Sequence, residues 1–256
     1  MRFGDIDFGF PGRAGEHPLV LKGLSLEIER GELFCLLGPS GCGKTTVLNL
    51  LAGFEQPAGG AIQVDGRPVT APGVERTVVF QGDDSLYTWL TAVENVEFGL
   101  RLAGVAPERR RATAERYLDL VGLRGQGHKY PSQLSGGMKQ RIQIARALVC
   151  ESPILLMDEP FAALDAQTRS TLQDELIGIW QQTGRTVLFI THDIGESILL
   201  ANRVGLMTAG PEARMKTIVP VDLARPRRRS DPAVGALYER LADMVSEEVR
   251  RAGALR

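Results

Sequence analysis

The chain has 256 residues, which is long enough to bury a substantial core as one large domain or as a core with subdomains. Its formal net charge is only -1 and charges of both signs are mixed, so nothing indicates a nucleic acid or an acidic membrane surface as a partner. The N-terminal stretch lacks the apolar core of a secretory signal, and no apolar run approaches the roughly 18 residues of a membrane span, so we expect any membrane role to come through another protein.

The N-terminal third predicts short strands joined by turns. Alternating apolar and polar residues over Leu19–Glu29 are typical of a strand, and so is the stretch before it, which puts Phe8 and Phe10 on one face. The continuous apolar run Leu33–Leu37 predicts a buried strand. A further β-rich section is expected over residues 58–80.

The segment that follows the buried strand reads GPSGCGKTT. Its glycines let the backbone turn so that several N–H groups point into one concavity, and the helix that starts there adds the positive end of its dipole. Lys44 can reach the β- and γ-phosphates of a nucleotide, and the Thr45 hydroxyl can bind Mg²⁺. A glycine-rich turn that binds nothing is the alternative, but every fixed position of the phosphate-loop motif and both flanks agree. We therefore expect a nucleoside triphosphate at Gly38, Pro39, Ser40, Gly41, Cys42, Gly43, Lys44, Thr45 and Thr46.

Two of the cysteines have contrasting surroundings. Cys35 stands in an apolar run, where a buried thiol is expected. Cys42 lies inside the phosphate loop and near a helix N-terminus, which can lower the pKa of a thiol. We expect Cys42 to be open to oxidation and to be protected from alkylation by bound nucleotide.

The middle of the chain predicts helices that alternate with apolar strands. Val93–Leu102 and Pro107–Leu120 carry apolar residues at helical spacing, and the second of them starts with proline. A third helix follows LSGGMKQR, and a fourth is expected at about Ala166–Thr183. The apolar runs Ile154–Met157 and Thr186–Asp193 are typical of buried parallel strands, so the pattern predicts an α/β core.

The C-terminal part is less informative. Pro220–Pro232 holds three prolines and an arginine run, so an irregular segment is expected. Ala233–Ala252 has the composition of a helix.

Two acidic residues, Asp158 and Glu159, directly follow one of the apolar strands. Asp158 is suited to hold Mg²⁺ directly or through water, and Glu159 is suited to orient and deprotonate an attacking water. A helix-capping turn before Pro160 is the structural alternative. Because a phosphate loop occurs earlier in the chain, we favour the catalytic interpretation.

Gln81 and His192 also follow predicted strands. The Gln81 amide could contact Mg²⁺ or the lytic water, and His192 could donate a hydrogen bond to a γ-phosphate. A glutamine at a strand end is ordinarily solvated and a single histidine is more often structural. Neither residue predicts a site by itself.

Ser135, Gly136 and Gly137 precede a helix within LSGGMKQR and could form a second anion-binding nest. The same residues could simply cap the helix, with Ser135 as the N-cap. One chain has one γ-phosphate to hold, so a second nest suggests two copies of the chain that share nucleotides.

Together these motifs resemble the ATP-binding subunit of ABC transporters. The resemblance rests on GPSGCGKTT, Gln81, LSGGMKQR, ILLMDEP, the ALD of Ala163–Asp165 and the THD that contains His192, in the family's order from about residue 5 to residue 210. Within that family, MDEPFAALDAQTRSTLQDEL and TVLFITHDIGES are similar to the importer branch that serves nitrate, aliphatic sulfonates, taurine and related small solutes.

The resemblance implies a fold: an α/β P-loop NTPase (RecA-like) core of ABC ATPase type, with an antiparallel β subdomain and an inserted α-helical subdomain. The implied ATP-binding domain is residues 1–215, with the helical subdomain at about 83–150. Residues 216–256 would be a C-terminal tail that is part helical.

The resemblance also implies roles in ATP hydrolysis with Mg²⁺. Glu159 would be the general base and His192 the γ-phosphate contact, while Phe10, rather than Phe8, would stack on adenine. Gln81 would link the metal site to the membrane partner. The implied catalytic residues are Glu159, His192, Lys44 and Gln81. The implied metal ligands are Thr45, Gln81 and Asp158.

The implied partners follow from the same resemblance. Ser135–Gly137 would close over the ATP bound by a second copy of the chain, and Asp165 would join the two sites across the dimer. Residues near Asp83–Trp89, with the helical region as far as Leu123, would receive a short helix from a transmembrane permease subunit. An external solute-binding protein would take part indirectly and no nucleic acid would be involved. The protein would lie peripherally at the cytoplasmic face of the membrane.

Several positions depart from the family pattern without removing a catalytic group: Thr88, Ala162, Gly195 and Ser197. Two other functions stay open, a soluble ABC ATPase that acts on a ribosome or DNA and the ATPase subunit of an exporter. The first usually has two cassettes or a long coiled coil, and the second is often fused to membrane helices, whereas this chain shows one cassette and no heptad run. A non-hydrolysing subunit is disfavoured because Lys44, Glu159 and His192 are all present. We favour an importer ATPase.

Overall fold

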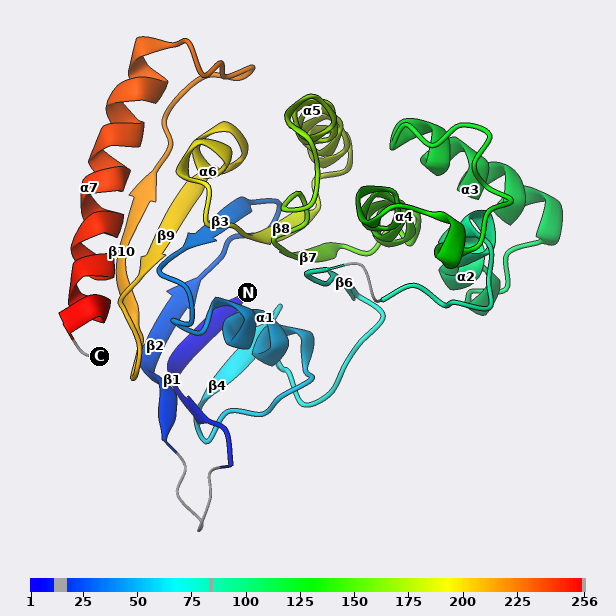
Figure 1. The fold of residues 1–256 in the computed structure, drawn as a ribbon. Helices are drawn as coiled ribbons and strands as arrows, with labels where there is room; N and C mark the ends of the chain where they lie inside the picture. The colour runs from blue at the N-terminus through cyan, green and yellow to red at the C-terminus, as the bar shows by residue number, and fades with distance from the viewer. Residues whose placement is uncertain (12–17, 83–84, 255–256) are drawn as a thin grey trace. The chain divides into compact units, whose positions relative to one another are not determined.

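The computed structural model describes residues 1–11, 18–82 and 85–254 (Figure 1). The chain divides into two units. Unit 1 combines residues 1–73 with residues 184–256, and unit 2 is residues 74–183. Unit 1 contains the predicted phosphate loop and His192, whereas unit 2 contains Gln81, LSGGMKQR and the acidic pair.

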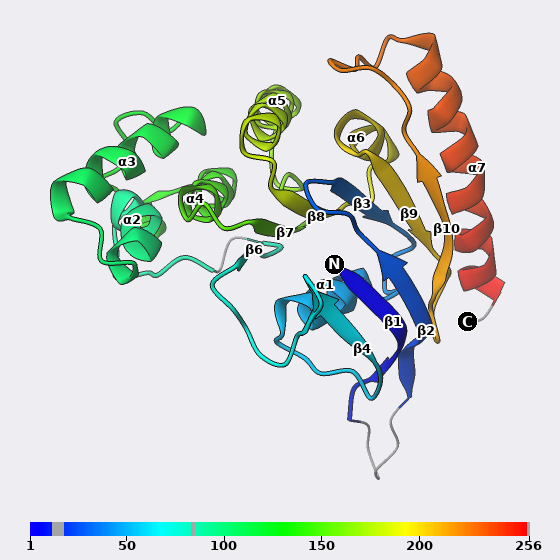
Figure 2. The ribbon, with the colours of Figure 1, turned by 180° about the vertical axis from the view of Figure 1, so that it is seen from behind.

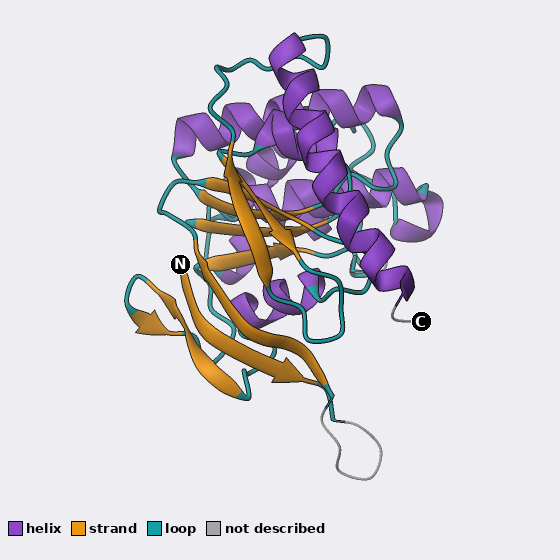
Figure 3. Cartoon of the chain, turned by 90° about the vertical axis from the view of Figure 1, so that its left-hand side faces the viewer, coloured by secondary structure: helices purple, strands orange, loops and turns teal. Residues whose placement is uncertain are grey.

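One part of unit 1 is an antiparallel sheet, and Figure 3 draws its strands in orange. Its strand order is β2-β1-β4-β5. The alternating pattern of β1 buries one side of the strand, where Phe3 lies opposite Ile62 of β4. Polar residues take the other side, as expected for a sheet that is covered on one face. The strand bounds are β1 (Arg2–Gly9), β2 (Leu19–Glu27), β4 (Gly59–Val64) and β5 (Arg67–Pro68).

The other strands of unit 1 include two of the predicted continuous apolar runs and two strands that were not predicted. β3 (Leu33–Leu37) lies between β8 (Thr186–Ile190) and β9 (Arg203–Met207) and is parallel to both, while β10 (Met215–Pro220) is antiparallel to β9. Every residue of β3 and β8 is buried. Leu36 of β3 lies opposite Ile190 of β8, so the chain leaves both strands at the same edge of the sheet.

The described residues of unit 1 form the helices α1 (Lys44–Ala52), α6 (Ile194–Leu200) and α7 (Pro232–Ala254). α1 contacts β8, and α6 packs against both β3 and α7. α7 runs beside β10 (Figure 1) and is joined to it by ion pairs from Lys216 to Glu247 and Glu248. Glu248 is buried and also accepts a hydrogen bond from the Ala209 amide at 2.9 Å, so the C-terminal helix is firmly attached.

Unit 2 has a pair of parallel strands and a group of helices. β6 (Arg76–Val79) pairs with β7 (Ile154–Asp158), with Val79 opposite Met157. The helices α2, α3 and α4 pack pairwise, and Figure 2 shows them grouped together. The helix bounds are α2 (Ala92–Leu102), α3 (Pro107–Leu120), α4 (Gly136–Val149) and α5 (Ala166–Thr183), with a 3₁₀ turn at Pro131–Gln133.

The predicted elements are confirmed with small shifts at their ends. The helix predicted at Val93–Leu102 is α2, which starts at Ala92 because Thr91 caps it. Phe10 follows β1 instead of lying within it. None of the helices in the described part of the chain has the length and apolar composition that crossing a membrane requires.

The start of α2 is a capping box made by Thr91 and Glu94. The Thr91 hydroxyl accepts a hydrogen bond from the Glu94 amide at 3.4 Å, and a Glu94 carboxylate oxygen accepts bonds from the Thr91 hydroxyl at 2.6 Å and the Thr91 amide at 2.8 Å. These bonds to Thr91, first the side-chain bond and then the backbone bond, lower the pKa of Glu94.

We expect Thr91→Ala to lower the free energy of unfolding by about 1 kcal/mol at pH 7, since it removes an N-cap. The pKa of Glu94 is lower in the folded chain than in the unfolded chain. The bonds between ionised Glu94 and Thr91 therefore stabilise the folded state fully above the ordinary glutamate pKa of about 4.3. This stabilisation is lost as the pH falls through the pKa of Glu94 in the folded chain. Urea unfolding of both proteins should therefore show a smaller difference at pH 4 than at pH 7. Thr171→Ala, at an exposed position inside α5, is the control, and an equal loss in that variant would contradict the capping role.

Candidate functional site

The phosphate loop connects β3 to α1 and needs glycine at its last turn. Gly43 has a φ of +92°, and a Cβ there would lie 2.9 Å from Leu21 Cδ2 and 3.0 Å from Val20 Cγ1. Gly41 also has a positive φ, +78°. Only glycine adopts these conformations readily, and only glycine fits against β2 at residue 43. The loop geometry is therefore specified by its sequence.

The first turn of α1 is suited to an anion. Within the described residues no side chain caps the helix, and its first turn contains no acidic residue. The first bond along the helix runs from the Val47 amide to the Gly43 carbonyl at 2.9 Å. The amides at a helix start carry partial positive charge, which favours a phosphate at this end.

Lys44 places its charge inside the same loop. Its side chain is buried, and Nζ donates to the carbonyls of Gly38 at 2.8 Å and of Pro39 at 3.0 Å. An ammonium group has no acceptor and three donors, so these bonds hold the cation while its charge stays available to an anion. Thr45 is exposed at the start of α1, and Thr46 is buried.

The expectation for Cys42 is wrong. The residue is only 1% exposed, and its Sγ lies where a Cβ on Gly38 would approach it to 2.7 Å. Burial raises the pKa of the Cys42 thiol, and the opposing effect of the Lys44 charge and amide does not outweigh it. The loop turns this side chain into the core, so proximity to the helix start does not activate it. Cys35 is buried as expected.

His192 lies at the carboxyl end of β8, beside the end of β3 from which the phosphate loop departs. The Thr191 amide donates to the Leu36 carbonyl at 3.4 Å, which fixes the chain where it leaves the sheet. The Thr191 hydroxyl donates to the buried Glu196 carboxylate at 2.5 Å and accepts from the Asp193 amide at 3.0 Å. His192 is exposed between these fixed neighbours. Unit 1 therefore brings His192 and the phosphate loop to one edge of the sheet, where ligands of such folds bind.

Unit 2 brings together Gln81 and the acidic pair. Gln81 follows β6, and its Nε2 donates to Glu159 Oε2 at 3.2 Å. Asp158 ends β7 and is 3% exposed, whereas Glu159 is half-buried. Glu159 has a φ of +45°, a left-handed conformation that costs a non-glycine residue about 1 kcal/mol or more. This strained turn points the chain so that Glu159 meets Gln81.

One face of α4 supports that arrangement, and it was missed from the sequence. Gln140 is buried, donates to the Glu159 carbonyl at 3.2 Å and accepts from the Ala163 amide at 3.1 Å. Gln143 donates to the Gly82 carbonyl at 2.8 Å, and Arg146 donates to the Ser85 carbonyl at 2.8 Å. The signal was present as polar residues three apart on an otherwise apolar helix.

The residues of LSGGMKQR form the start of α4. Ser135 is the N-cap, and its hydroxyl accepts from the Met138 amide at 3.3 Å. Gly136 and Gly137 are the first residues of the helix. Ser135 therefore caps α4, as the structural alternative predicts. The cap uses the Ser135 oxygen as an acceptor, so the hydroxyl hydrogen can still be donated to another group.

Asp165 has a local role of its own. Its Oδ1 accepts from the Thr168 amide at 2.9 Å at the start of α5. That backbone bond, with the Thr168 side-chain bond, lowers the pKa of Asp165.

The aromatic candidates differ in exposure. Phe8 is buried, whereas Phe10 is 47% exposed and meets Phe8 edge to face, with 5.0 Å between ring centroids. Only Phe10 has a ring face that a base could cover. In the expected docking segment, Asp83 and Asp84 lie outside the described residues, and Trp89 is 70% exposed.

The donor chemistry fits ATP with Mg²⁺. Lys44 and the α1 amides suit phosphate oxygens. Thr45, Gln81 and Asp158 offer the hydroxyl, amide and carboxylate oxygens that Mg²⁺ prefers, with Thr45 in unit 1 and the other two in unit 2. No group of three or more histidine, cysteine or acidic residues suited to a metal occurs among the described residues.

We expect Cys42 of the native protein to resist iodoacetamide at pH 8, with or without ATP, because the thiol is buried and its pKa is raised. Peptide mapping by mass spectrometry would measure its labelling. The denatured protein is the control and should label at all cysteines. Equal labelling rates of Cys42 in the native and denatured proteins would contradict the buried position.

Comparison with known proteins identifies the family. The family model described as ABC transporter matches residues 21–162. The chain is 48% identical to the taurine import ATP-binding protein TauB of Chromobacterium violaceum, over 97% of each chain. It is 46% identical to the bicarbonate transport ATP-binding protein CmpC of Synechococcus elongatus, over 89% of this chain and 34% of that protein.

A solved structure agrees with the fold. The ATP-binding cassette MJ0796, in a dimeric post-hydrolysis state bound to ADP and Pi, superposes with a TM-score of 0.77 at 29% identity, over 87% of this chain and 99% of that one. This confirms the expected fold class, a P-loop NTPase core of ABC ATPase type with an antiparallel β subdomain and an inserted helical subdomain. The chain belongs to the ABC transporter family and is one of its ATP-binding, ATP-hydrolysing cassettes.

Proposed function

We propose that the chain is the ATPase subunit of a membrane importer for a small solute. The observation that carries ATP chemistry is the phosphate loop, in which Lys44 is buried against two loop carbonyls beside an uncapped helix start. The names of the relatives TauB and CmpC, one an import protein and the other a transport protein, support the importer over an exporter or an ATPase of ribosomes or DNA.

In the proposed mechanism Glu159 accepts a proton from the attacking water. Gln81 holds one oxygen of that carboxylate through its amide, so the other oxygen can face the water. Lys44 and the amides of α1 neutralise the phosphate oxygens, and His192 donates a hydrogen bond to the γ-phosphate. Catalysis then rests on position and charge rather than on covalent chemistry.

Mg²⁺ would be held by Thr45, Gln81 and Asp158 and would draw charge from the phosphate oxygens when bound. Phe10 would stack on the adenine, since its ring is the exposed one of the pair. The ATP-binding domain would be residues 1–215, with the helical subdomain at about 83–150 built around α2, α3 and α4.

A second copy of the chain would complete each site. Ser135, Gly136 and Gly137 lie at a helix start and retain a hydroxyl donor, which suits a phosphate of the partner's nucleotide. The dimeric state of the solved cassette supports this arrangement. Asp165 would lie near the contact between copies.

The remaining partners belong to the membrane. Trp89 is strongly exposed, and Tyr87 beside it packs on Phe98 at 4.6 Å between ring centroids. We propose that this aromatic surface receives a short helix of a permease subunit, which would hold the ATPase at the cytoplasmic face. The solute would be of the nitrate, sulfonate or taurine type and would be delivered by an external binding protein.

Glu159→Gln should retain ATP binding and lose at least about a hundredfold in ATP turnover, since it removes the general base but keeps the shape. The variant should also accumulate as an ATP-bound dimer, which light scattering after gel filtration would measure. Glu175→Gln, an exposed carboxylate on α5, is the matched control. Normal turnover by Glu159→Gln would defeat the general-base assignment.

A mixing experiment tests the shared site. Lys44→Ala and Ser135→Arg should each be inactive alone. A mixture should recover ATPase activity, because a mixed dimer pairs the intact phosphate loop of one copy with the intact Ser135 of the other. The absence of recovery, with mixed dimers demonstrated by differential tags, would contradict a site built from two copies.

A further inference from the structure

The segment between β10 and α7 returns to α6, the helix that follows His192. Residues 221–231 form no helix or strand, yet they bring three arginines to α6. Arg225 donates from Nη1 to the Leu199 carbonyl at 2.9 Å and from Nη2 to the Leu200 carbonyl at 2.5 Å. These are carbonyls of the last turn of α6, which lack partners within the helix.

Arg227 binds the same helix end and also its own segment. Its Nη1 donates to the carbonyls of Ile198 at 2.7 Å and Ala201 at 2.6 Å. Its Nη2 donates to the Val221 carbonyl at 2.9 Å, and its Nε donates to the Leu223 carbonyl at 3.0 Å. One planar guanidinium therefore ties the tail to the end of α6, a task that its fixed fork of donors suits.

Charge also favours this contact. The carbonyl end of a helix carries partial negative charge, which stabilises cations there. Burial, followed by the nearby charge of Arg227, lowers the pKa of Arg225 to about 10. Arg225 thus stays charged at neutral pH, and its half-buried guanidinium meets carbonyl oxygens.

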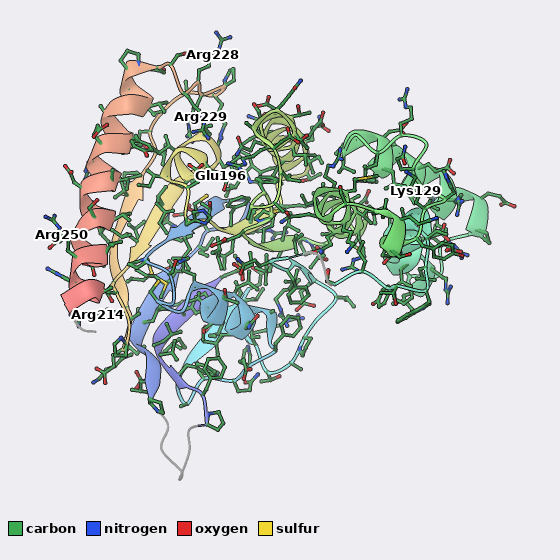
Figure 4. The ribbon with its side chains drawn as sticks, in the orientation of Figure 1. Lys129, Glu196, Arg214, Arg228, Arg229 and Arg250 are labelled. Carbon is green, nitrogen blue, oxygen red and sulfur yellow. The ribbon has the colours of Figure 1, made fainter. Side chains whose placement is uncertain are left out.

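Arg229 acts at the other end of α6. Its Nη2 lies 3.9 Å from Oδ2 of Asp193, the N-cap of the helix, and Figure 4 shows Arg229 and Glu196 at α6. A Cβ on Gly195 would come within 2.7 Å of Arg229 Nη1. Gly195, one of the departures from the family pattern, therefore leaves room for this guanidinium.

His192 is joined directly to the helix that the arginines hold. Asp193 caps α6 by accepting from the Glu196 amide at 2.9 Å, and Glu196 in turn accepts from the Thr191 hydroxyl. The residues on both sides of His192 are thus bonded to the first turn of α6. A shift of α6 would move His192 relative to the phosphate loop of unit 1.

We infer that Arg225, Arg227 and Arg229 are positioning residues for ATP hydrolysis: they fix α6 at both ends and thereby hold His192 in place. The inference rests on the proposed contact of His192 with the γ-phosphate. In this inference, residues 221–231 between β10 and α7 hold α6, a role that is separate from the chemistry of the phosphate loop.

The test uses the full chain with Arg225→Met and Arg227→Met. We expect kcat for ATP hydrolysis to fall about tenfold or more, with KM for ATP and the affinity for ADP within about twofold, because only the γ-phosphate contact is displaced. Arg227→Lys should restore little, since one ammonium cannot span the same carbonyls. Arg228→Met removes an exposed arginine of the same run and should leave kcat unchanged.

Two further measurements separate positioning from simple stability. Hydrogen exchange followed by mass spectrometry should rise in residues 191–200 and stay constant in β3 and α1. In a His192→Ala background, Arg227→Met should cause no further loss of kcat. If the half-buried Arg225 and Arg227 prove essential for folding, the exchange and kcat measurements are made on Arg229→Met, which changes an exposed side chain.

The outcomes are distinguishable. If His192→Ala reduces kcat but the arginine variants do not, or if their losses add fully to that of His192→Ala, the positioning role is overturned while the proposed function stands. If His192→Ala keeps full turnover, the γ-phosphate contact is wrong and the positioning role falls with it. A loss confined to kcat, with coupled double variants, supports the inference.

Discussion

In unit 1, the strands β3 and β8 run parallel with every residue buried, and Leu36 lies opposite Ile190 where both strands end. Buried strands of this kind have no place for polar chemistry along their length, so polar groups appear only where the chain leaves the sheet. The phosphate loop follows β3 and His192 follows β8 at that edge. β6 and β7 repeat the arrangement in unit 2, where Gln81 and Glu159 meet.

The hydrogen bonds that place Lys44 and Gln140 run to backbone groups. Lys44 is bonded to loop carbonyls, and Gln140 binds the backbone of Glu159 and Ala163. Backbone partners cannot change rotamer or protonation state, so they fix a side chain without altering its charge. Because Ser135 caps α4 and Gln140 follows about one and a half turns later, the proposed anion nest at Ser135–Gly137 and the support of the turn at Glu159 belong to one helix.

The sequence predicted most of the strands and helices and an α/β core because those depend on local patterns: apolar runs, helical spacing and a glycine loop with fixed positions. The detailed fold class came from the family resemblance, and β9, β10 and α6 were not predicted. The sequence failed where the outcome depends on which way one side chain turns. Cys42 was expected to be reactive, yet the loop directs it toward Gly38 and the core. No role was predicted for Gln140, Arg225 or Arg227. Their partners include backbone groups 19 or more residues away, and sequence spacing cannot reveal such contacts.

Arg225 and Arg227 also affect the order in which parts of the chain can fold during synthesis. α6 has seven residues, too few to be stable as a helix alone, and the carbonyls at its end are satisfied by residues made later. A chain synthesised only as far as Pro220 already contains the phosphate loop, the strands beside it and His192. It lacks the groups that complete α6. The carbonyls at the end of α6 therefore gain these partners only after residues 221–231 have been synthesised and have folded back onto the helix.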